Sequence, residues 1–338
     1  MKLSALRTMG ALRTTAVALT AALTVAVVAG GAATAAPDKA SGVSSIVKDG
    51  RTWHLQVYSA AMKRDIPIDV QRPAEESKSA PTFYMLNGLD GGAGTATWTA
   101  KTQALEFLTD KHVNVIQVLD GRGSYFTDWK QEDPNLGLNK WRTFLTEELP
   151  PLLEATLASN GLNALAGLST SGTSVLQLAE AKPGLFKSVA AYSGCAQIAD
   201  PMGRQAVKFA VEPWAGGNTL NMYGPEDDPA WVENDPVIHA EKLRGTHLYV
   251  SSGSGMPTNA DIAYYLKPEA GVFGAVELGL GIGIEAATNA CSQNLKAKLD
   301  SLNIPATFQF TPMGTHYWPY WEQALLDSWP VLAKGLGI

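Results

Sequence analysis

Short runs of β-branched and aromatic residues alternate along the chain with longer stretches in which apolar residues recur at helical spacing. The short runs predict strands over residues 52–58, 67–70, 82–86, 113–119, 164–168, 188–192, 247–251 and 306–310. The longer stretches predict helices over residues 99–110, 140–158, 171–181, 284–302 and 318–336. Strands and helices in alternation favour an α/β fold, in which a mostly parallel sheet is covered by helices on both faces. No helix separates the first strands, so we expect the sheet to start antiparallel.

One segment interrupts this alternation. Residues 196–236 are rich in Pro, Gly, Trp and Asp and follow the strand predicted over residues 188–192. Long irregular insertions in compact domains are usually functional, so we expect this one to overhang the active site. Residues 36–43 are interpreted as a short flexible leader. No linker or internal repeat divides the chain after it, which predicts a single catalytic domain over residues 44–338.

The N-terminal segment has the pattern of a targeting sequence. Lys2, Arg7 and Arg13 precede an apolar stretch over residues 14–31, and small residues follow at Ala33-Thr34-Ala35. This order predicts a cleaved secretory signal peptide over residues 1–35, and therefore a secreted protein. The alternative is a transmembrane anchor, because the apolar stretch is about long enough to cross a bilayer.

Composition and charge exclude several classes of function. Of 338 residues, 46% are hydrophobic and 17% are charged, which is enough to bury a large core. The net charge is −6, and without residues 1–35 the chain keeps 23 basic and 32 acidic side chains, a net charge of −9. Such a chain, with no basic cluster, is a poor candidate for binding nucleic acid.

The chain has two cysteines, Cys195 and Cys291, both in the part that would be exported. Two are too few for a cysteine-based zinc site, and the histidines show no close metal-ligand pairing, so we expect no metal. In an oxidising compartment the two cysteines are predicted to form a disulfide bond. The bridge would tie the predicted helix over residues 284–302 to the carboxyl edge of the sheet.

The segment Gly167-Leu168-Ser169-Thr170-Ser171-Gly172 is interpreted as a nucleophile elbow. It lies between a predicted strand and a predicted helix, the context in which a strained turn exposes a serine hydroxyl. The residues two before and two after the serine must be small, and here they are Gly167 and Ser171, where the usual pattern ends in Gly. A helix N-cap serine is the alternative, but the context favours Ser169 as a nucleophile.

A serine nucleophile requires a base and an acid that orients it. Among the five histidines, only His316 lies between the last predicted strand and the last predicted helix, where this architecture takes its base. The order of serine, acid and histidine along the chain is that of the α/β-hydrolase fold. For the acid, Asp261 and Glu285 both satisfy this order, which does not separate them.

Two backbone amides would form the oxyanion hole. One is expected from Thr170, directly after the nucleophile, and the other from the glycine-rich loop over residues 87–92. Glycines in that loop allow the backbone to approach a ligand closely, although an ordinary glycine-rich turn has the same composition.

Taken together, these segments resemble the secreted mycolyltransferases, the antigen 85-type enzymes of mycolic-acid-bearing bacteria. The resemblance covers about residues 53–335. The matching segments are Tyr84–Leu89, Ser124–Trp129, Lys140–Leu145, Gly167–Ser169, Tyr223–Pro225, Asp228–Trp231, Asn234–Pro236 and Gly314–Trp321.

The resemblance implies an α/β-hydrolase fold and a catalytic triad of Ser169, Glu285 and His316, which favours Glu285 over Asp261. It implies oxyanion donors at the backbone of Leu89 and Thr170. It also implies a trehalose pocket that involves Asn87 and Trp318.

Two departures affect these details. The best-known members have an acid where this chain has Asn87 and an arginine where it has Asp90, and both touch sugar in those members. Residues 253–283 match poorly, and we expect them to line the acyl groove.

The function that the resemblance implies is transfer of a mycolyl group from trehalose monomycolate to a sugar hydroxyl, on a second trehalose monomycolate or on cell-wall arabinan. It requires no cofactor. We expect a monomer at the cell envelope, in contact with outer envelope lipids and without a nucleic-acid partner. The alternatives are a secreted carboxylesterase with water as the acceptor, and a non-enzymatic envelope-binding protein on the same fold.

Overall fold

Nine strands form one sheet in the computed structural model, which describes residues 39–338. The predicted signal peptide over residues 1–35 and the first part of the predicted leader lie outside the described residues. The strands lie in the order β1-β2-β3-β5-β4-β6-β7-β8-β9. Their bounds are β1 Gly42–Asp49, β2 Thr52–Ser59, β3 Arg64–Gln71, β4 Thr82–Leu86, β5 Asn114–Val118, β6 Asn163–Leu168, β7 Phe186–Tyr192, β8 His247–Ser252 and β9 Ala306–Phe310.

The first four strands across the sheet pair antiparallel, from β1 through β2 and β3 to β5, and every later pair is parallel. The predicted antiparallel start and mostly parallel centre are therefore confirmed. Residues of β4, β5 and β6 are buried on both faces, as expected for parallel strands between two layers of helices.

All eight predicted strands are present as β2 to β9, but the sequence did not reveal β1. The leader predicted over residues 36–43 is wrong at its end, because β1 begins at Gly42. Most of β1 is exposed, so it carries no alternation of buried and exposed positions that a pattern could show. Pairing of its backbone with β2 forms the strand, which lies at the edge of the sheet.

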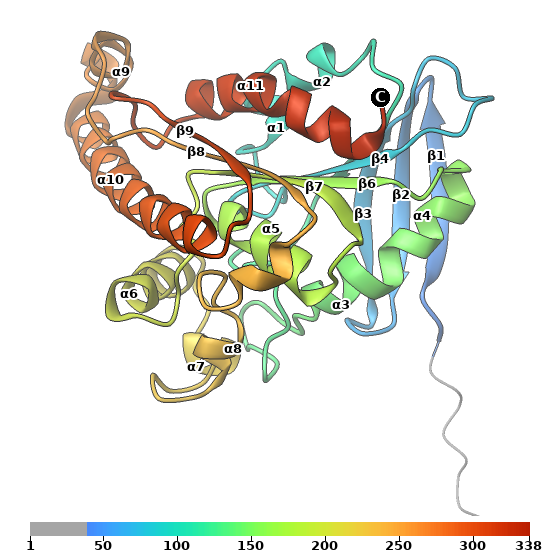
Figure 1. The fold of residues 1–338 in the computed structure, drawn as a ribbon, viewed down its shortest axis with the longest axis horizontal. Coiled ribbons are helices and arrows are strands. Elements are labelled where there is room, and N and C mark those ends of the chain that lie inside the picture. The colour runs from blue at the N-terminus through green and yellow to red at the C-terminus, as the bar shows by residue number, and fades with distance from the viewer. Residues whose placement is uncertain (1–38) are drawn as a thin grey trace, which may run out of the picture. The chain divides into compact units, whose positions relative to one another are not determined.

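Helices cover both faces of the sheet (Figure 1). One face packs against α1 (Trp98–Lys101), α2 (Ala104–Phe107) and α11 (Trp318–Leu336). The other packs against α3 (Trp141–Thr143), a π-helix η1 (Phe144–Glu148), α4 (Leu149–Leu157), α5 (Thr170–Ala181) and the C-terminal part of α10 (Gly271–Ser301).

The insertion over residues 196–236 is mostly helical. It contains α6 (Pro201–Phe209), the π-helix η2 (Ala210–Trp214), α7 (Thr219–Met222) and α8 (Ala230–Glu233). These helices share a small core of their own, in which Trp231 and Tyr223 pack with Tyr125 and Trp129. The short elements η3 (Ala240–Leu243), α9 (Asn259–Tyr265) and η4 (Pro268–Ala270) complete the chain.

Helix α10 begins at Gly271, well before the start predicted at residue 284. Glycine costs about 1 kcal/mol per residue in a helix relative to alanine, so the glycines between residues 271 and 283 obscured its first half. Within residues 39–338, the segment Pro268–Ser301 is also the one helix long and apolar enough to cross a membrane, by length and composition alone. Its C-terminal part belongs to the core through Leu295 and Leu299.

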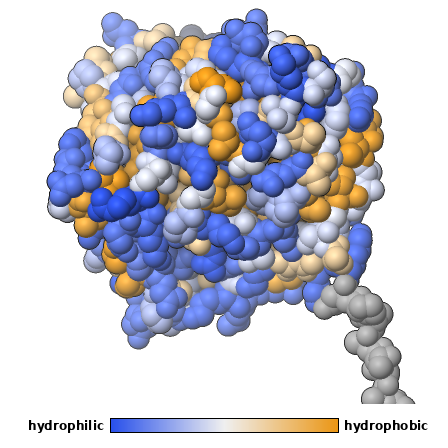
Figure 2. All heavy atoms as spheres, turned by 45° about the vertical axis from the view of Figure 1, so that its right-hand side comes forward, coloured by the Kyte–Doolittle hydropathy of each residue, from blue (hydrophilic) through white to orange (hydrophobic). Residues whose placement is uncertain are grey.

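The surface has the mixed character usual for proteins in contact with water. On the face shown in Figure 2, hydrophilic residues predominate and hydrophobic residues are scattered among them.

Candidate active site

Ser169 lies at the turn between β6 and α5, with φ of 56° and ψ of −125°. A non-glycine residue rarely adopts a positive φ, and such strain is typical of a nucleophile elbow. A Cβ at Gly167 would lie 2.6 Å from the carbonyl oxygen of Ser171, and a Cβ at Gly172 would lie 2.8 Å from that of Tyr192. The turn therefore requires glycine at both positions.

Ser171 occupies the place where the usual motif has glycine. Its hydroxyl accepts a hydrogen bond from the backbone amide of Leu168 at 2.9 Å and lies 3.0 Å from the Leu168 carbonyl oxygen. The Ser171 hydroxyl thus forms hydrogen bonds inside the turn, so the turn accommodates serine at this position.

A hydrogen-bonded chain joins Ser169, His316 and Glu285. Ser169 Oγ lies 2.8 Å from His316 Nε2, and His316 Nδ1 lies 2.8 Å from Glu285 Oε2. A carboxylate can only accept, so the proton lies on Nδ1, and Nε2 is free to accept the Ser169 hydroxyl proton. The imidazole packs edge-on against Trp321, with ring centroids 4.8 Å apart. This geometry can activate a serine nucleophile.

Three donors hold the second oxygen of Glu285, whose side chain is 1% exposed. Glu285 Oε1 accepts from Ser193 Oγ at 2.8 Å, from Ser252 Oγ at 3.0 Å and from the Gly253 amide at 2.6 Å. Ser193 in turn accepts from the indole of Trp321 at 3.0 Å. The carboxylate is therefore fixed in place and paired on both oxygens.

Asp261 lies elsewhere. It caps α9, where Asp261 Oδ2 accepts from the backbone amide and the hydroxyl of Thr258. The same oxygen accepts from the Tyr320 hydroxyl at 2.7 Å. Burial raises the pKa of Tyr320 to about 12, so this phenol remains a donor at neutral pH. The structure brings Glu285, and not Asp261, to His316.

Leu89 and Thr170 line the same cavity as Ser169. The Leu89 carbonyl accepts from the Gly123 amide at 2.8 Å, which holds the loop after β4 in position. Within residues 39–338, neither the Leu89 amide nor the Thr170 amide donates to another protein group. Both are therefore available to an oxyanion.

The cavity has a volume of about 680 Å³ and is mainly apolar. One wall is formed by α6 and η2, through residues that include Met202, Phe209 and Trp214. The opposite wall is α10, from Glu277 to Cys291. Residues of the insertion over residues 196–236 and of the poorly matching segment over residues 253–283 therefore line the same cavity as Ser169 and His316. The prediction that this cavity is an acyl groove stays a prediction.

Asn87 does not line the apolar cavity, and the sugar contact predicted for its side chain stays a prediction. It is fully buried, and Asn87 Oδ1 accepts from the Trp98 amide at 3.0 Å while Nδ2 donates to the Val118 carbonyl at 3.4 Å. The side-chain amide of Asn87 thus links the loop after β4 to the backbone of Trp98 and Val118. An acid at this position would lack the Nδ2 donor.

Trp318 is half-buried at the start of α11, two residues after His316. Its ring packs edge-on against Trp98 and Trp321, with centroids 5.8 Å and 5.2 Å away. It lies near the site without lining the apolar cavity, so a contact with sugar from this ring remains a proposal.

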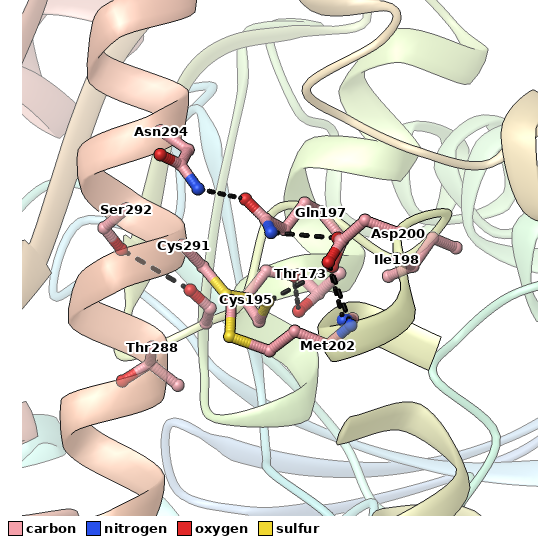
Figure 3. The surroundings of a disulfide bond; sticks show 12 residues. Thr173, Cys195, Gln197, Ile198, Asp200, Met202, Thr288, Cys291, Ser292 and Asn294 are labelled. Carbon is pink, nitrogen blue, oxygen red and sulfur yellow. Dashed lines mark hydrogen bonds between the residues drawn. A yellow bond between two sulfur atoms is a disulfide. The ribbon is translucent and has the colours of Figure 1, made fainter. Parts of the chain in front are cut away.

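A disulfide joins Cys195, in the loop after β7, to Cys291 on α10 (Figure 3). The predicted pairing is present in the structure. Both cysteines line the cavity, and Cys291 lies six residues beyond Glu285 on the same helix.

Sequence reasoning missed several residues of this site. Ser193 and Ser252 lie at the carboxyl ends of β7 and β8, the edge at which α/β folds place their sites, and that position was the available signal. The cavity residues Phe209 and Trp214 carried no such signal, because their role depends on how the insertion folds. Within the part of the chain described, no cluster of three or more potential ligands could hold a metal ion.

Comparison with known proteins agrees with this geometry. The esterase family model matches residues 59–332. The diacylglycerol acyltransferase/mycolyltransferase Ag85C of Mycobacterium leprae is 32% identical over 292 residues, which cover 82% of this chain and 80% of that protein.

Two solved structures share the fold. MPT51 of Mycobacterium tuberculosis aligns with a TM-score of 0.71 at 23% identity, over 85% of this chain and all of that one. The S-formylglutathione hydrolase of Agrobacterium tumefaciens aligns with a TM-score of 0.62 at 16% identity, over 87% of this chain and 99% of that one. The chain therefore has the α/β-hydrolase fold.

Proposed function

Because this chain belongs to the antigen 85-type mycolyltransferase family, we propose that it transfers a mycolyl group from trehalose monomycolate to a sugar hydroxyl through a serine acyl-enzyme. The observation that carries the proposal is the hydrogen-bonded chain of Ser169, His316 and Glu285, of which Ser169 and His316 line an apolar cavity. Such a cavity suits the hydrocarbon of a long acyl group.

In the first half-reaction Ser169 Oγ attacks the ester carbonyl carbon of the donor, and His316 Nε2 takes the hydroxyl proton. Glu285 orients the imidazole and stabilises its charged form. The amides of Leu89 and Thr170 donate to the oxyanion of the tetrahedral intermediate. The intermediate collapses as His316 returns the proton to the departing trehalose oxygen, which leaves the acyl group esterified to Ser169.

The second half-reaction reverses these steps. A hydroxyl of the acceptor attacks the acyl-enzyme carbonyl while His316 removes its proton, and the Ser169 oxygen leaves and recovers that proton. The acceptor would be a second trehalose monomycolate or cell-wall arabinan. The relatives are also named as diacylglycerol acyltransferases, so diacylglycerol is a further acceptor to test.

We also propose that the enzyme acts outside the cytoplasm, at the cell envelope. A cleaved signal peptide over residues 1–35 would export the protein to the cell envelope, where donor and acceptor lipids lie. The Cys195–Cys291 disulfide supports an oxidising compartment. We propose that Trp318, near His316, offers an aromatic face to the sugar.

A carboxylesterase is the second candidate, and the match to the esterase family model favours it. The same three residues serve hydrolysis when water replaces the sugar acceptor. The alternative of a non-enzymatic envelope-binding protein does not require a serine hydroxyl bonded to a fixed histidine.

The test is incubation of the purified protein with labelled trehalose monomycolate, followed by lipid analysis of the products. We expect trehalose dimycolate from the wild type and a loss of about 10⁴-fold or more in Ser169→Ala. Titration with an active-site serine phosphonate should label the wild type alone. A near-normal rate in Ser169→Ala would contradict the assignment, and a wild type that binds donor without turnover would indicate the binding protein.

A further inference from the structure

The Cys195–Cys291 disulfide lies in the lining of the apolar cavity. Both cysteines line the cavity, and Cys291 is the last residue of α10 that does so. The next residue on that face of the helix, Leu295, is fully buried in the main core. Because a helix rises 1.5 Å per residue, the stretch of α10 that lines the cavity, from Glu277 to Cys291, is about 21 Å long. The part from Glu285, which bonds His316, to Cys291 is about 9 Å long.

Polar side chains connect the two walls of the cavity just beyond the disulfide (Figure 3). Asn294 on α10 donates to Gln197 Oε1 at 2.6 Å, and Gln197 donates to Asp200 Oδ2 at 2.9 Å. Asp200 is the residue that caps the start of α6. These bonds join α10 to the start of α6 beyond the sulfur atoms.

The side of this junction that faces the cavity is apolar. Figure 3 shows the Met202 side chain beside the two sulfur atoms, with Thr288 on the neighbouring turn of α10. Met202 and Thr288 both line the cavity together with the cysteines. Sulfur is soft and polarizable, and it packs well against hydrocarbon.

We propose that the Cys195–Cys291 disulfide and Met202 form the end wall of the acyl pocket, and that this wall sets the longest acyl chain the enzyme accepts. The inference rests on the proposed function, since it treats the cavity as the acyl site. Met202, which is 41% exposed, can change its side-chain conformation, whereas the covalent cross-link behind it cannot be displaced by a side-chain rotation. A chain longer than the pocket must bend or leave it, and the added carbons then gain no buried contact.

The experiment measures kcat/KM on p-nitrophenyl esters from butyryl to stearoyl. Met202→Ala removes most of one side chain from the end wall and so enlarges the pocket without breaking the cross-link. The double variant Cys195→Ala with Cys291→Ala removes the cross-link itself. Both should raise the ratio of stearoyl to butyryl kcat/KM by about tenfold or more, the usual effect of methylene-sized changes in an apolar pocket. Ala206→Leu, which fills the cavity from α6, should lower the same ratio.

Met256→Ala is the matched control, because Met256 is exposed and does not line the cavity. It should leave the ratio unchanged. If the double variant fails to fold, Met202→Ala and Ala206→Leu still decide the matter. An active enzyme whose chain-length profile is the same in every variant would overturn the inference alone. A wild type without activity on any ester and on trehalose monomycolate would overturn the proposed function, and the inference with it.

Discussion

At the scale of single residues, Glu285 has an environment that only a carboxylate satisfies. Its two oxygens accept from four donors: His316 on one side, and Ser193, Ser252 and the Gly253 amide on the other. An amide in its place would direct an N–H toward one of those donors. Both oxygens of Glu285 therefore act as hydrogen-bond acceptors, which is what a carboxylate that orients a histidine requires.

Glu285→Gln should consequently lower kcat by about 10⁴-fold, because the imidazole would lose the partner that fixes its tautomer. Asp261→Asn should cost far less activity, since Asp261 caps α9 and bonds Tyr320 but not His316. Steady-state kinetics on the same ester compare the two variants, with circular dichroism to check that both are folded. The reverse ranking would move the role of the acid to Asp261.

Glu180 is a second residue whose environment makes a measurable prediction. It is buried on α5, and Glu180 Oε1 has no hydrogen-bond partner among the described residues. Burial raises the pKa of Glu180 well above its ordinary value of 4.5, while nearby Lys242 partly offsets the effect. The folded protein therefore holds this proton more tightly than the unfolded chain does.

With a raised folded-state pKa, the stability contributed by the protonated carboxyl is complete below the unfolded pKa and is lost as pH rises through the folded pKa. Glu180→Gln imitates the protonated form, so it should raise the free energy of unfolding at neutral pH and make no difference near pH 4. Urea unfolding at a series of pH values measures this. Glu132→Gln is the control, because Glu132 is exposed and does not contribute to the pKa shift of Glu180, and it should change little at any pH.

At the scale of elements, the disulfide links the two segments that hold the acid in place. Cys195 lies two residues after Ser193, and Cys291 lies six residues after Glu285. The bridge thus joins the two segments that carry Ser193 and Glu285, whose side chains are hydrogen-bonded to each other. In the proposed acyl pocket it also forms part of the end wall.

Mild reduction of the native protein should lower activity before global unfolding, because the support of Glu285 would loosen first. The sequence separation of 96 residues also predicts a loss of stability, typically about 2–4 kcal/mol. Activity and far-UV circular dichroism, followed together against reductant, test the order of events. Reduction that leaves activity unchanged would make the bridge purely structural, and two freely alkylated thiols in the native protein would exclude it.

At the scale of the whole molecule, the candidate site lies between α11 and the helices of the insertion over residues 196–236. The aromatic side chains of α11 pack beside His316, and the helices of the insertion cover the apolar cavity. In the proposed reaction these side chains would reduce the access of water to the acyl-enzyme, which would favour transfer to a bound sugar over hydrolysis. Trp321 belongs to the core, whereas Trp318 is only half-buried.

Transfer should therefore outrun hydrolysis when a sugar acceptor is abundant. Quantifying free mycolic acid against acylated acceptor, over a range of acceptor concentrations, measures this partition. Heat-inactivated protein provides the baseline for spontaneous hydrolysis. Predominance of the free acid at saturating acceptor would identify the protein as an esterase.

The sequence by itself determined the architecture and the nucleophile-base pair as candidates. Strand runs and helical periodicity are local properties, so they located β2 to β9 and most of the helices packed on the sheet. The elbow around Ser169 was recognisable because its steric demands fall on immediate neighbours, Gly167 and Ser171. His316 was recognisable because chain order in this architecture limits where the base can lie.

Only the tertiary structure decided which partners meet. It brought Glu285 rather than Asp261 to His316, buried the side chain of Asn87, and extended α10 through a segment that contains several glycines. It also assembled a cavity between α6 and α10, whose walls lie far apart in sequence. Local patterns report the conformation that a segment prefers, whereas these outcomes depend on the packing of segments that are distant along the chain.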